Sequence, residues 1–145
     1  MRRATERTIV AGSPQRCYEV VADLERYPEW AADIKEVKVL ERDAEGRPSL
    51  AAFRAAAFGR STSYTLRYDH SKAPGQLSWV QADGDLTRRL DGAYVFEPAG
   101  EGHTEVSYHL DVELAVPLPG FVKRRAESRI VHTALDELKA RVESG

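Results

Sequence analysis

Hydrophobic and polar positions alternate along much of the chain, and this alternation predicts a series of short strands. The clearest case runs from His103 to Leu114, where Thr104, Val106 and every second residue after them face one way and polar residues face the other. Such a pattern is typical of an antiparallel strand with one face in water. Further strands are predicted over Thr5–Ala11, Ile34–Arg42, Pro48–Ala57, Ser61–Asp69, Leu77–Ala82 and Thr87–Glu97.

Turn residues separate these strands, so we expect them to pair in hairpin series. The strongest signal is Asp83-Gly84, because glycine tolerates the positive φ of a tight hairpin turn. We therefore expect the chain to reverse there. Weaker turn signals lie at Glu45-Gly46, Gly59, Pro74-Gly75 and Pro98–Gly102.

A helical period replaces the alternation between the first two strands. Ser13 is a good N-cap and Pro14 suits the first helical position. Pro28 lacks an N–H and disfavours the α region for Tyr27, which predicts a helix break there and a pair of short helices. We expect this pair to close one end of the sheet, with Tyr27 and Trp30 setting the angle between the helices and Trp30 packed under the sheet end.

The second helical segment, Phe121–Glu143, is the only one long enough to cover an apolar sheet face. Its apolar residues recur mainly in steps of four, which overshoot a 3.6-residue turn, so the apolar stripe winds around the axis. The second half is well filled with apolar residues. The first half offers little beyond Val122, Ala126 and Ile130.

Small residues on two facing elements predict a space between sheet and helix. The strand Pro48–Ala57 has Phe53 and the alanines Ala55 and Ala57 on one face, opposite the sparse half of the helix. An empty apolar cavity of ~300 Å³ would cost about 7 kcal/mol, which is comparable with a whole stability of ~5–15 kcal/mol. Either a ligand or water with polar groups would share the space. The alternative is that aromatic residues fill it, namely Phe53, Tyr64, Tyr68, Trp79, Tyr94, Phe96 and Tyr108.

Composition narrows the classes of function. The 145 residues suit one domain, 1–145, and a net charge of −2 does not favour nucleic acid as a partner. The single cysteine, Cys17, excludes an internal disulfide, and we expect it to be a buried small hydrophobe rather than a reactive thiol. The first residues lack the apolar segment of a signal peptide, and no apolar run is long enough to span a membrane, so we expect a cytoplasmic location.

Four motifs resemble the START-like and Bet v 1-like (SRPBCC) superfamily, within its polyketide cyclase/dehydrase-like and coenzyme-Q-binding branch. They are SPQRCYEVVADLERYPEW from Ser13 to Trp30, G-x-Y-x-F from Gly92, T-x-V-x-Y from Thr104, and PLPGF from Pro117. The resemblance implies an α+β helix-grip fold. In that fold a seven-stranded antiparallel sheet curls around a long C-terminal helix, with two short helices between strands 1 and 2.

The resemblance also implies a deep pocket for a hydrophobic or aromatic small molecule. Some members are polyketide aromatase/cyclases, whereas others carry lipids or quinones. The family's pocket arginine is matched here by Tyr68, its pocket tyrosine by Ile34, and the neighbouring Arg67 is expected to point outward. This departure argues against the cyclase hypothesis and favours a lipid-, polyketide- or quinone-like ligand held by a carrier or sensor.

We expect ligand contacts from residues that the alternation or the helical period turns toward the predicted space. Arg88 shares the phase of Leu90 and Tyr94, so it would point inward and could bind a carboxylate or enol or orient a carbonyl; alternatively, it lies at the strand start in water. A cyclase would need an inward acid or base, for which Arg88, Tyr64 and Tyr68 are the only candidates. The full set is Phe53, Ala55, Ala57, Tyr64, Tyr68, Trp79, Arg88, Tyr94, Tyr108, Val122, Ala126 and Ile130.

Other chemistry is not indicated. None of the histidines His70, His103, His109 and His132 has a second ligand at metal spacing, so we expect no metal or cofactor and solvated histidine rings. The basic residues Lys123, Arg124, Arg125 and Arg129 follow an apolar loop that ends at Phe121. They could make transient membrane contact through Phe121 and Lys123/Arg124/Arg125, or form an ordinary solvated helix face. The sequence leaves the oligomeric state open.

Overall fold

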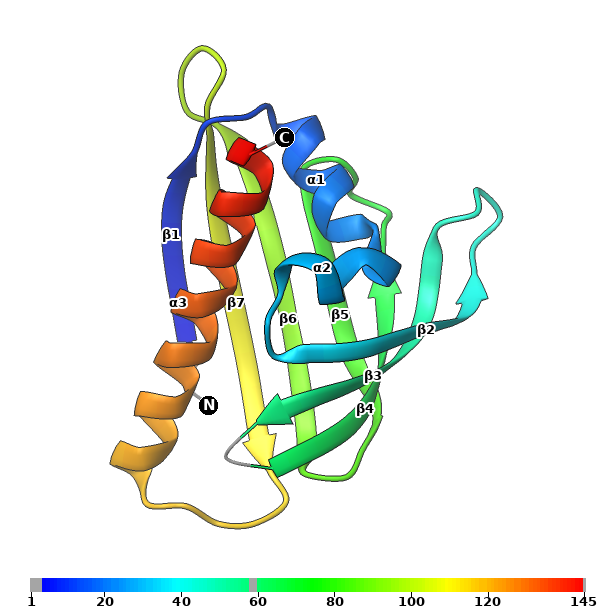
Figure 1. Cartoon of the computed structure of the whole chain (residues 1–145), viewed down its shortest axis with the longest axis vertical. Coiled ribbons are helices and arrows are strands. Elements are labelled where there is room, and N and C mark those ends of the chain that lie inside the picture. The colour runs from blue at the N-terminus through cyan, green and yellow to red at the C-terminus, as the bar shows by residue number, and fades with distance from the viewer. Residues whose placement is uncertain (1–3, 58–59, 145) are drawn as a thin grey trace.

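The computed structural model describes residues 4–57 and 60–144, and its main element is one curved antiparallel sheet (Figure 1). Neighbouring strands follow the order β1-β7-β6-β5-β4-β3-β2, so β1 and β2 form the two edges. The predicted seven-stranded sheet is therefore confirmed. The strands are β1 (Ala4–Val10), β2 (Ile34–Arg42), β3 (Pro48–Ala57), β4 (Arg60–Asp69), β5 (Gln76–Gly84), β6 (Thr87–Pro98) and β7 (Thr104–Leu114).

Helices cover the concave side of this sheet. The long helix α3 (Gly120–Ser144) packs along β1 and β7, and the short helices lie between β1 and β2 at one end, as predicted (Figure 1). The short helices are α1 (Pro14–Ala22), the 3-10 turn η1 (Leu24–Arg26) and α2 (Tyr27–Trp30). The Ser13 hydroxyl caps α1 by accepting the Arg16 amide at 3.1 Å, as its N-cap position predicts.

The break between the short helices lies earlier than predicted. It falls at Asp23, with φ −86° and ψ 75°, whereas Tyr27 is helical at φ −51° and ψ −41°. The prediction that Pro28 excludes Tyr27 from the α region was wrong. Pro28 stands in the first turn of α2, where its missing N–H has no helical partner to lose. The Tyr27 hydroxyl instead fixes the angle by donating to the Val21 carbonyl at 2.5 Å.

The turn between β5 and β6 also differs from the prediction. Asp83 and Gly84 belong to β5, and the chain reverses at Asp85 and Leu86. The Asp85 carboxylate accepts hydrogen bonds from the Thr62 hydroxyl and the Ser63 amide, which attaches the turn to β4. These contacts come from a strand far away in the sequence, so the local Asp-Gly signal did not reveal them.

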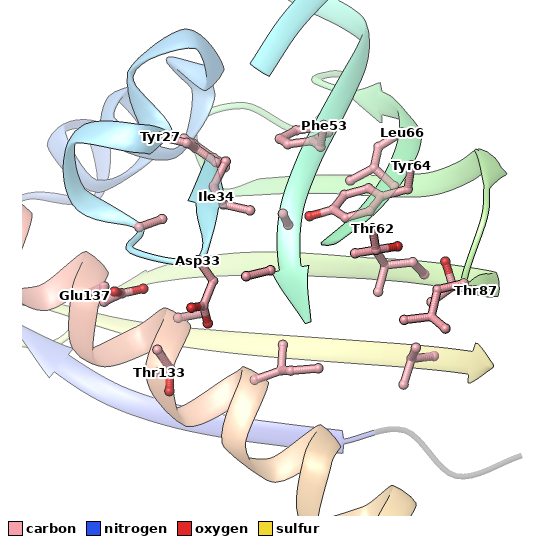
Figure 2. Close-up of a pocket in the computed structure, with 18 of the residues that line it drawn as sticks. Tyr27, Asp33, Ile34, Phe53, Thr62, Tyr64, Leu66, Thr87, Thr133 and Glu137 are labelled. Atoms are coloured by element: carbon pink, nitrogen blue, oxygen red, sulfur yellow. The ribbon is translucent and has the colours of Figure 1, made fainter. Parts of the chain in front are cut away.

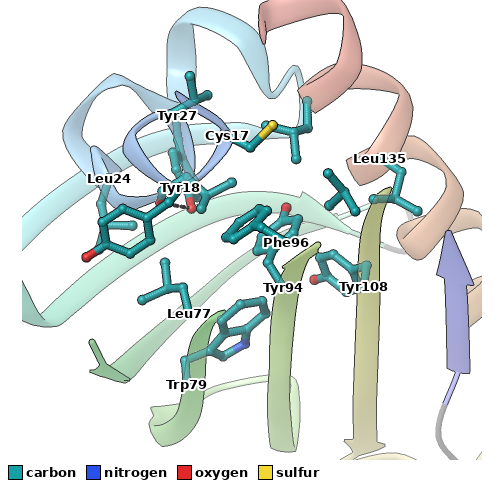
Figure 3. Close-up of a cluster of buried hydrophobic side chains, with 14 of the residues drawn as sticks. Cys17, Tyr18, Leu24, Tyr27, Leu77, Trp79, Tyr94, Phe96, Tyr108 and Leu135 are labelled. Carbon is teal, nitrogen blue, oxygen red and sulfur yellow. Dashed lines mark hydrogen bonds between the residues drawn. The ribbon is translucent and has the colours of Figure 1, made fainter. Parts of the chain in front are cut away.

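Two adjacent faces of α3 have different surroundings. Val131, Leu135, Leu138 and Val142 are buried in the core between helix and sheet. Cys17 is completely buried in the same core, as predicted, and burial raises the pKa of its thiol (Figure 3). The adjacent face of α3 borders a cavity.

Candidate functional site

A cavity of about 830 Å³ lies between α3 and the concave face of the sheet (Figure 2). Its wall combines α3 and α2 with strands β2 to β7, so nearly every element of the fold contributes. The volume falls within the ~300–1,000 Å³ of typical small-molecule sites. The space predicted from small residues on the strand Pro48–Ala57 and on the helix is therefore present.

Aromatic rings form the deep wall of this cavity. Tyr68, Trp79, Tyr94 and Tyr108 line it and are each at most 8% exposed. Their rings also pack on one another: Tyr94 and Tyr108 meet edge to face with centroids 4.7 Å apart, and Trp79 lies 5.7 Å from both (Figure 3). The alternative that aromatic residues simply fill the space is thus only partly right, because the rings build a wall and leave a cavity beside it. Phe96 alone of the seven lies in the core outside the lining.

Four tyrosine hydroxyls on this wall form no hydrogen bond with any described residue. They belong to Tyr64, Tyr68, Tyr94 and Tyr108, and buried tyrosines usually have such a partner. Burial raises the pKa of all four, and the Asp33 charge adds to the rise at Tyr64. At neutral pH these groups are uncharged hydroxyls, suited to hydrogen-bonding a ligand oxygen and unsuited to act as general bases.

The structure brings together most residues of the predicted site. Trp79 and the tyrosines are joined by aliphatic side chains from both facing elements, although ligand contact itself stays a prediction. The predicted residues that line the cavity are Phe53, Ala55, Tyr64, Tyr68, Trp79, Tyr94, Tyr108, Ala126 and Ile130. The side chain of Ala57 lies outside the described residues.

Arg88 does not belong to the cavity lining, and its expected inward orientation was wrong. The pairing of β6 with β7 shifts between Thr87 and Arg89, and this irregularity reverses the alternation at the strand start. Thr87 consequently faces the cavity and Arg88 is exposed. The alternative, that Arg88 lies in water at the strand start, holds.

Val122 also lies outside the lining, with 37% of its surface exposed. It sits in the first turn of α3, and a four-residue step rotates it about 40° from Ala126. The cavity wall on α3 continues in the other direction, through Ile130 to Thr133, Ala134 and Glu137.

Sequence reasoning missed lining residues at both ends of the cavity: Arg60, Thr62 and Thr87 beside the β5–β6 turn, and a polar and aromatic group at the α2 end. Tyr27 and Trp30 line it, so these rings do more than set the helix angle. The carboxylates of Asp33 and Glu137 face the cavity (Figure 2). Thr133 also lines it, about one helical turn before Glu137 on α3. The helical series 126, 130, 133, 137 contained the signal for Thr133 and Glu137, whereas Asp33 precedes its strand and had no periodicity to place it.

No histidine is among the described residues that line the cavity. His70 is buried rather than solvated as expected: its Nδ1 lies 2.8 Å from the Tyr18 hydroxyl and its Nε2 lies 2.6 Å from the Pro48 carbonyl oxygen. Both ring nitrogens are thus engaged within the core. Over residues 4–57 and 60–144, no group of three His, Cys, Asp or Glu side chains could hold a metal ion.

Comparison with known proteins gives the same architecture. The family described as "Polyketide cyclase / dehydrase and lipid transport" matches residues 10–139. The chain belongs to this family. A START superfamily protein from Mycobacterium smegmatis is 25% identical, with a TM-score of 0.93 over 98% of this chain and 97% of that one. No curated protein matches the chain.

Two further solved structures share the fold at lower identity. The Zhui aromatase/cyclase from Streptomyces sp. R1128 is 14% identical, with a TM-score of 0.84 over 98% of this chain and 93% of its own. TTHA0849 from Thermus thermophilus is 22% identical, with a TM-score of 0.79 over 99% and 98% of the two chains. The helix-grip START fold is thereby established. None of the helices in the described part of this family member is long and apolar enough to cross a membrane.

Proposed function

We propose that this protein binds a hydrophobic or aromatic small molecule in the cavity and acts as a carrier or sensor in the cytoplasm. The cavity of about 830 Å³ with its aromatic wall carries the proposal. The cavity is open to solvent, since the exposed Asp33 and Arg129 stand in its wall. A ligand or water must therefore occupy it, and apolar burial would supply most of the affinity for a ligand.

A second candidate function is polyketide aromatase/cyclase activity in the same cavity. The description of the family names such cyclases, and proton transfer needs an acid or base at the cavity wall. Arg88 is exposed and the neutral tyrosines are poor bases, which leaves the Asp33 and Glu137 carboxylates as the groups able to take a proton. The two carboxylates lie together at one end of the cavity, whereas a multistep cyclisation would take place along its length. Their position therefore favours the binding and orientation of a ligand over cyclisation.

Transient membrane contact forms part of the proposal for a carrier. Phe121 is 62% exposed and Val116 is 51% exposed, and Lys123, Arg124 and Arg125 follow directly on α3. In Figure 1 this start of α3 lies at the same end of the molecule as the β5–β6 turn, whose Leu86 lines the cavity. An apolar surface with adjacent cations suits an anionic bilayer.

Binding can be tested with pyrenemethanol, a neutral aromatic alcohol whose fluorescence responds to its surroundings. We expect the unmodified protein to bind it, and Ala126→Trp to weaken binding at least tenfold because the indole occupies the cavity. Ala140→Trp is the matched control, since Ala140 is exposed on the same helix. Native mass spectrometry of the purified protein would show whether a small molecule accompanies it. Absence of binding, or equal binding by Ala126→Trp, would overturn the proposal.

A further inference from the structure

Two carboxylates lie side by side at the α2 end of the cavity. Glu137 of α3 accepts the Ala32 amide on its Oε2 at 3.0 Å, and Asp33 is the next residue after Ala32. The Asp33 carbonyl in turn accepts the Ala56 amide at 2.8 Å, which attaches this segment to β3. Since consecutive Cα atoms are 3.8 Å apart, these bonds hold the two side chains next to each other. Figure 2 shows both carboxylates directed into the cavity.

Neither carboxylate has a cationic partner among the described residues. Elsewhere on the surface acidic side chains are commonly paired, as Glu25 is with Arg42 at 2.7 Å. The nearest lysine in the sequence, Lys35, donates to the Ala32 carbonyl at 2.7 Å and forms no ion pair with Asp33 or Glu137. Two arginines line the cavity, and neither forms an ion pair with Asp33 or Glu137. Arg129 lies two helical turns before Glu137, about 12 Å along the axis, and Arg60, at the start of β4, lies close enough to Asp85 to help lower the pKa of that carboxyl. The corner formed by Asp33 and Glu137 therefore carries uncompensated negative charge.

A buried hydroxyl beside this corner also needs a partner. Tyr94 is 5% exposed, lines the cavity, and its hydroxyl bonds to no described residue. Tyr94 and Glu137 both line this cavity; burial is the main cause of the raised pKa of Tyr94, and the Glu137 charge adds to the rise. A neutral phenol can accept a hydrogen bond from an N–H donor. Tyr94 and the two carboxylates thus present acceptors to one region, with an aromatic wall beside it.

We propose that the ligand of this cavity carries a protonated amine, which binds between Asp33 and Glu137 while its apolar or aromatic body lies against the rings of Tyr94 and Tyr108. The inference rests on the proposed function, because it assigns the head group of the same ligand. Hydrogen bonds between charged groups are stronger than neutral ones, so removing the charge of either partner weakens the contact.

Three probes with one aromatic body test this assignment. Pyrenemethylamine is cationic at neutral pH, pyrenemethanol is neutral and pyrenecarboxylate is anionic. We expect the amine to bind about tenfold more tightly than the alcohol, and the carboxylate to bind most weakly. Higher salt should reduce the preference, since Asp33 is exposed to solvent.

Variants that remove charge show whether a preference for the amine comes from Asp33 and Glu137 or from the overall charge of the protein. In the double variant Asp33→Asn with Glu137→Gln we expect the amine and the alcohol to bind equally. The amide oxygen introduced by Glu137→Gln can still accept the Ala32 amide, so the fold is retained. Asp136→Asn is the matched control for Glu137→Gln alone, because it removes the same single charge from the neighbouring, solvent-facing position on α3, and it should leave the amine preference intact.

The results with the three probes distinguish failure of the amine assignment from failure of the proposed function. If pyrenemethanol binds and the amine binds no more tightly, the amine assignment is overturned and the cavity remains a binding site. A preference for the amine that persists in the double variant likewise overturns it, because the selectivity then comes from elsewhere. If none of the three probes binds, the proposed function fails, and the assignment of its head group fails with it.

Discussion

Gly92 shows how one residue shapes the cavity wall. A Cβ atom at this position would lie 2.5 Å from Cζ2 of Trp79 and 2.7 Å from the backbone oxygen of His109. No side chain fits in this space, so a glycine at position 92 lets the indole of Trp79 lie directly on β6. The G-x-Y-x-F motif thus combines a site for Trp79 with the inward rings of Tyr94 and Phe96.

We expect Gly92→Ala to destabilise the protein by about 1–3 kcal/mol, because overpacking forces Trp79 or β6 to move. Urea unfolding measures the free energy, and near-ultraviolet circular dichroism reports the indole environment. Gly75→Ala is the control: its Cβ would make only an ordinary contact of 3.5 Å with the Lys72 carbonyl. A Gly92→Ala protein as stable as the control variant, with an unchanged spectrum, would contradict this account.

Alternation alone predicted the orientation of most cavity residues. It placed Tyr64, Tyr68 and Tyr94 inward, and the structure has them on the cavity wall. It failed at Arg88, because one irregular position in the ladder shifts the phase and the composition of the strand does not reveal it. Side-chain pattern therefore predicts regular strands well and their bulged ends poorly.

At the scale of elements, His70 joins three parts of the chain. It follows β4, and its ring lies between Tyr18 of α1 and Pro48 at the start of β3. The Pro48 carbonyl can only accept, so Nε2 carries the proton, Nδ1 accepts, and the Tyr18 hydroxyl donates. One buried imidazole thereby attaches the short helix to two neighbouring strands.

Tyr18→Phe should cost about 1–3 kcal/mol, because it leaves Nδ1 of His70 buried without a donor. Tyr94→Phe is a matched control, since the Tyr94 hydroxyl bonds to no other described residue and its loss should change the stability little. Denaturant unfolding of the two variants at neutral pH makes the comparison. Equal stability of the two would show that the bond to His70 contributes nothing.

The local sequence pattern predicted which helices and strands form, but it did not predict where some of them end and join. The bounds of β2 and β3 agree with the predicted segments, and the turn signal Glu45-Gly46 lies between them. The helix break at Asp23 and the turn at Asp85 depend on bonds to distant or later residues, namely from Tyr27 to Val21 and from Thr62 to Asp85. Such contacts exist only once the fold has brought their partners together.

At the scale of the whole molecule, the cavity exists because the sheet curls from one side of α3 to the other. β1 packs along the helix, and the opposite edge approaches it again where Ala32, just before β2, donates to Glu137. Small residues predicted that space would remain inside this curl. The carboxylates at its end could not be foreseen in full, because the position of Asp33 depends on the path between α2 and β2.

The same architecture places the apolar and basic start of α3 at the end of the molecule where Leu86 and Thr87 border the cavity (Figure 1). Over the described residues, Arg124 and Arg125 form no ion pair, and Lys123 contacts Glu127 at 3.7 Å. An apolar ligand leaving the cavity at this end would pass directly between protein and bilayer. A carrier would gain from membrane contact here, whereas a sensor would not require it.

Vesicle flotation tests this contact. We expect the protein to float with phosphatidylserine-containing vesicles, and the triple variant Lys123→Gln, Arg124→Gln, Arg125→Gln to lower the bound fraction at least tenfold, because each cation contributes about 1 kcal/mol near an anionic surface. A control with the same change in charge replaces Lys38, Arg54 and Arg67, which are exposed on β2 to β4. It should float like the parent, because those strands offer no comparable apolar loop.

Phe121→Asp should also reduce flotation, since the ring can no longer enter the bilayer. Flotation that survives both the triple variant and Phe121→Asp would exclude this surface as the membrane contact.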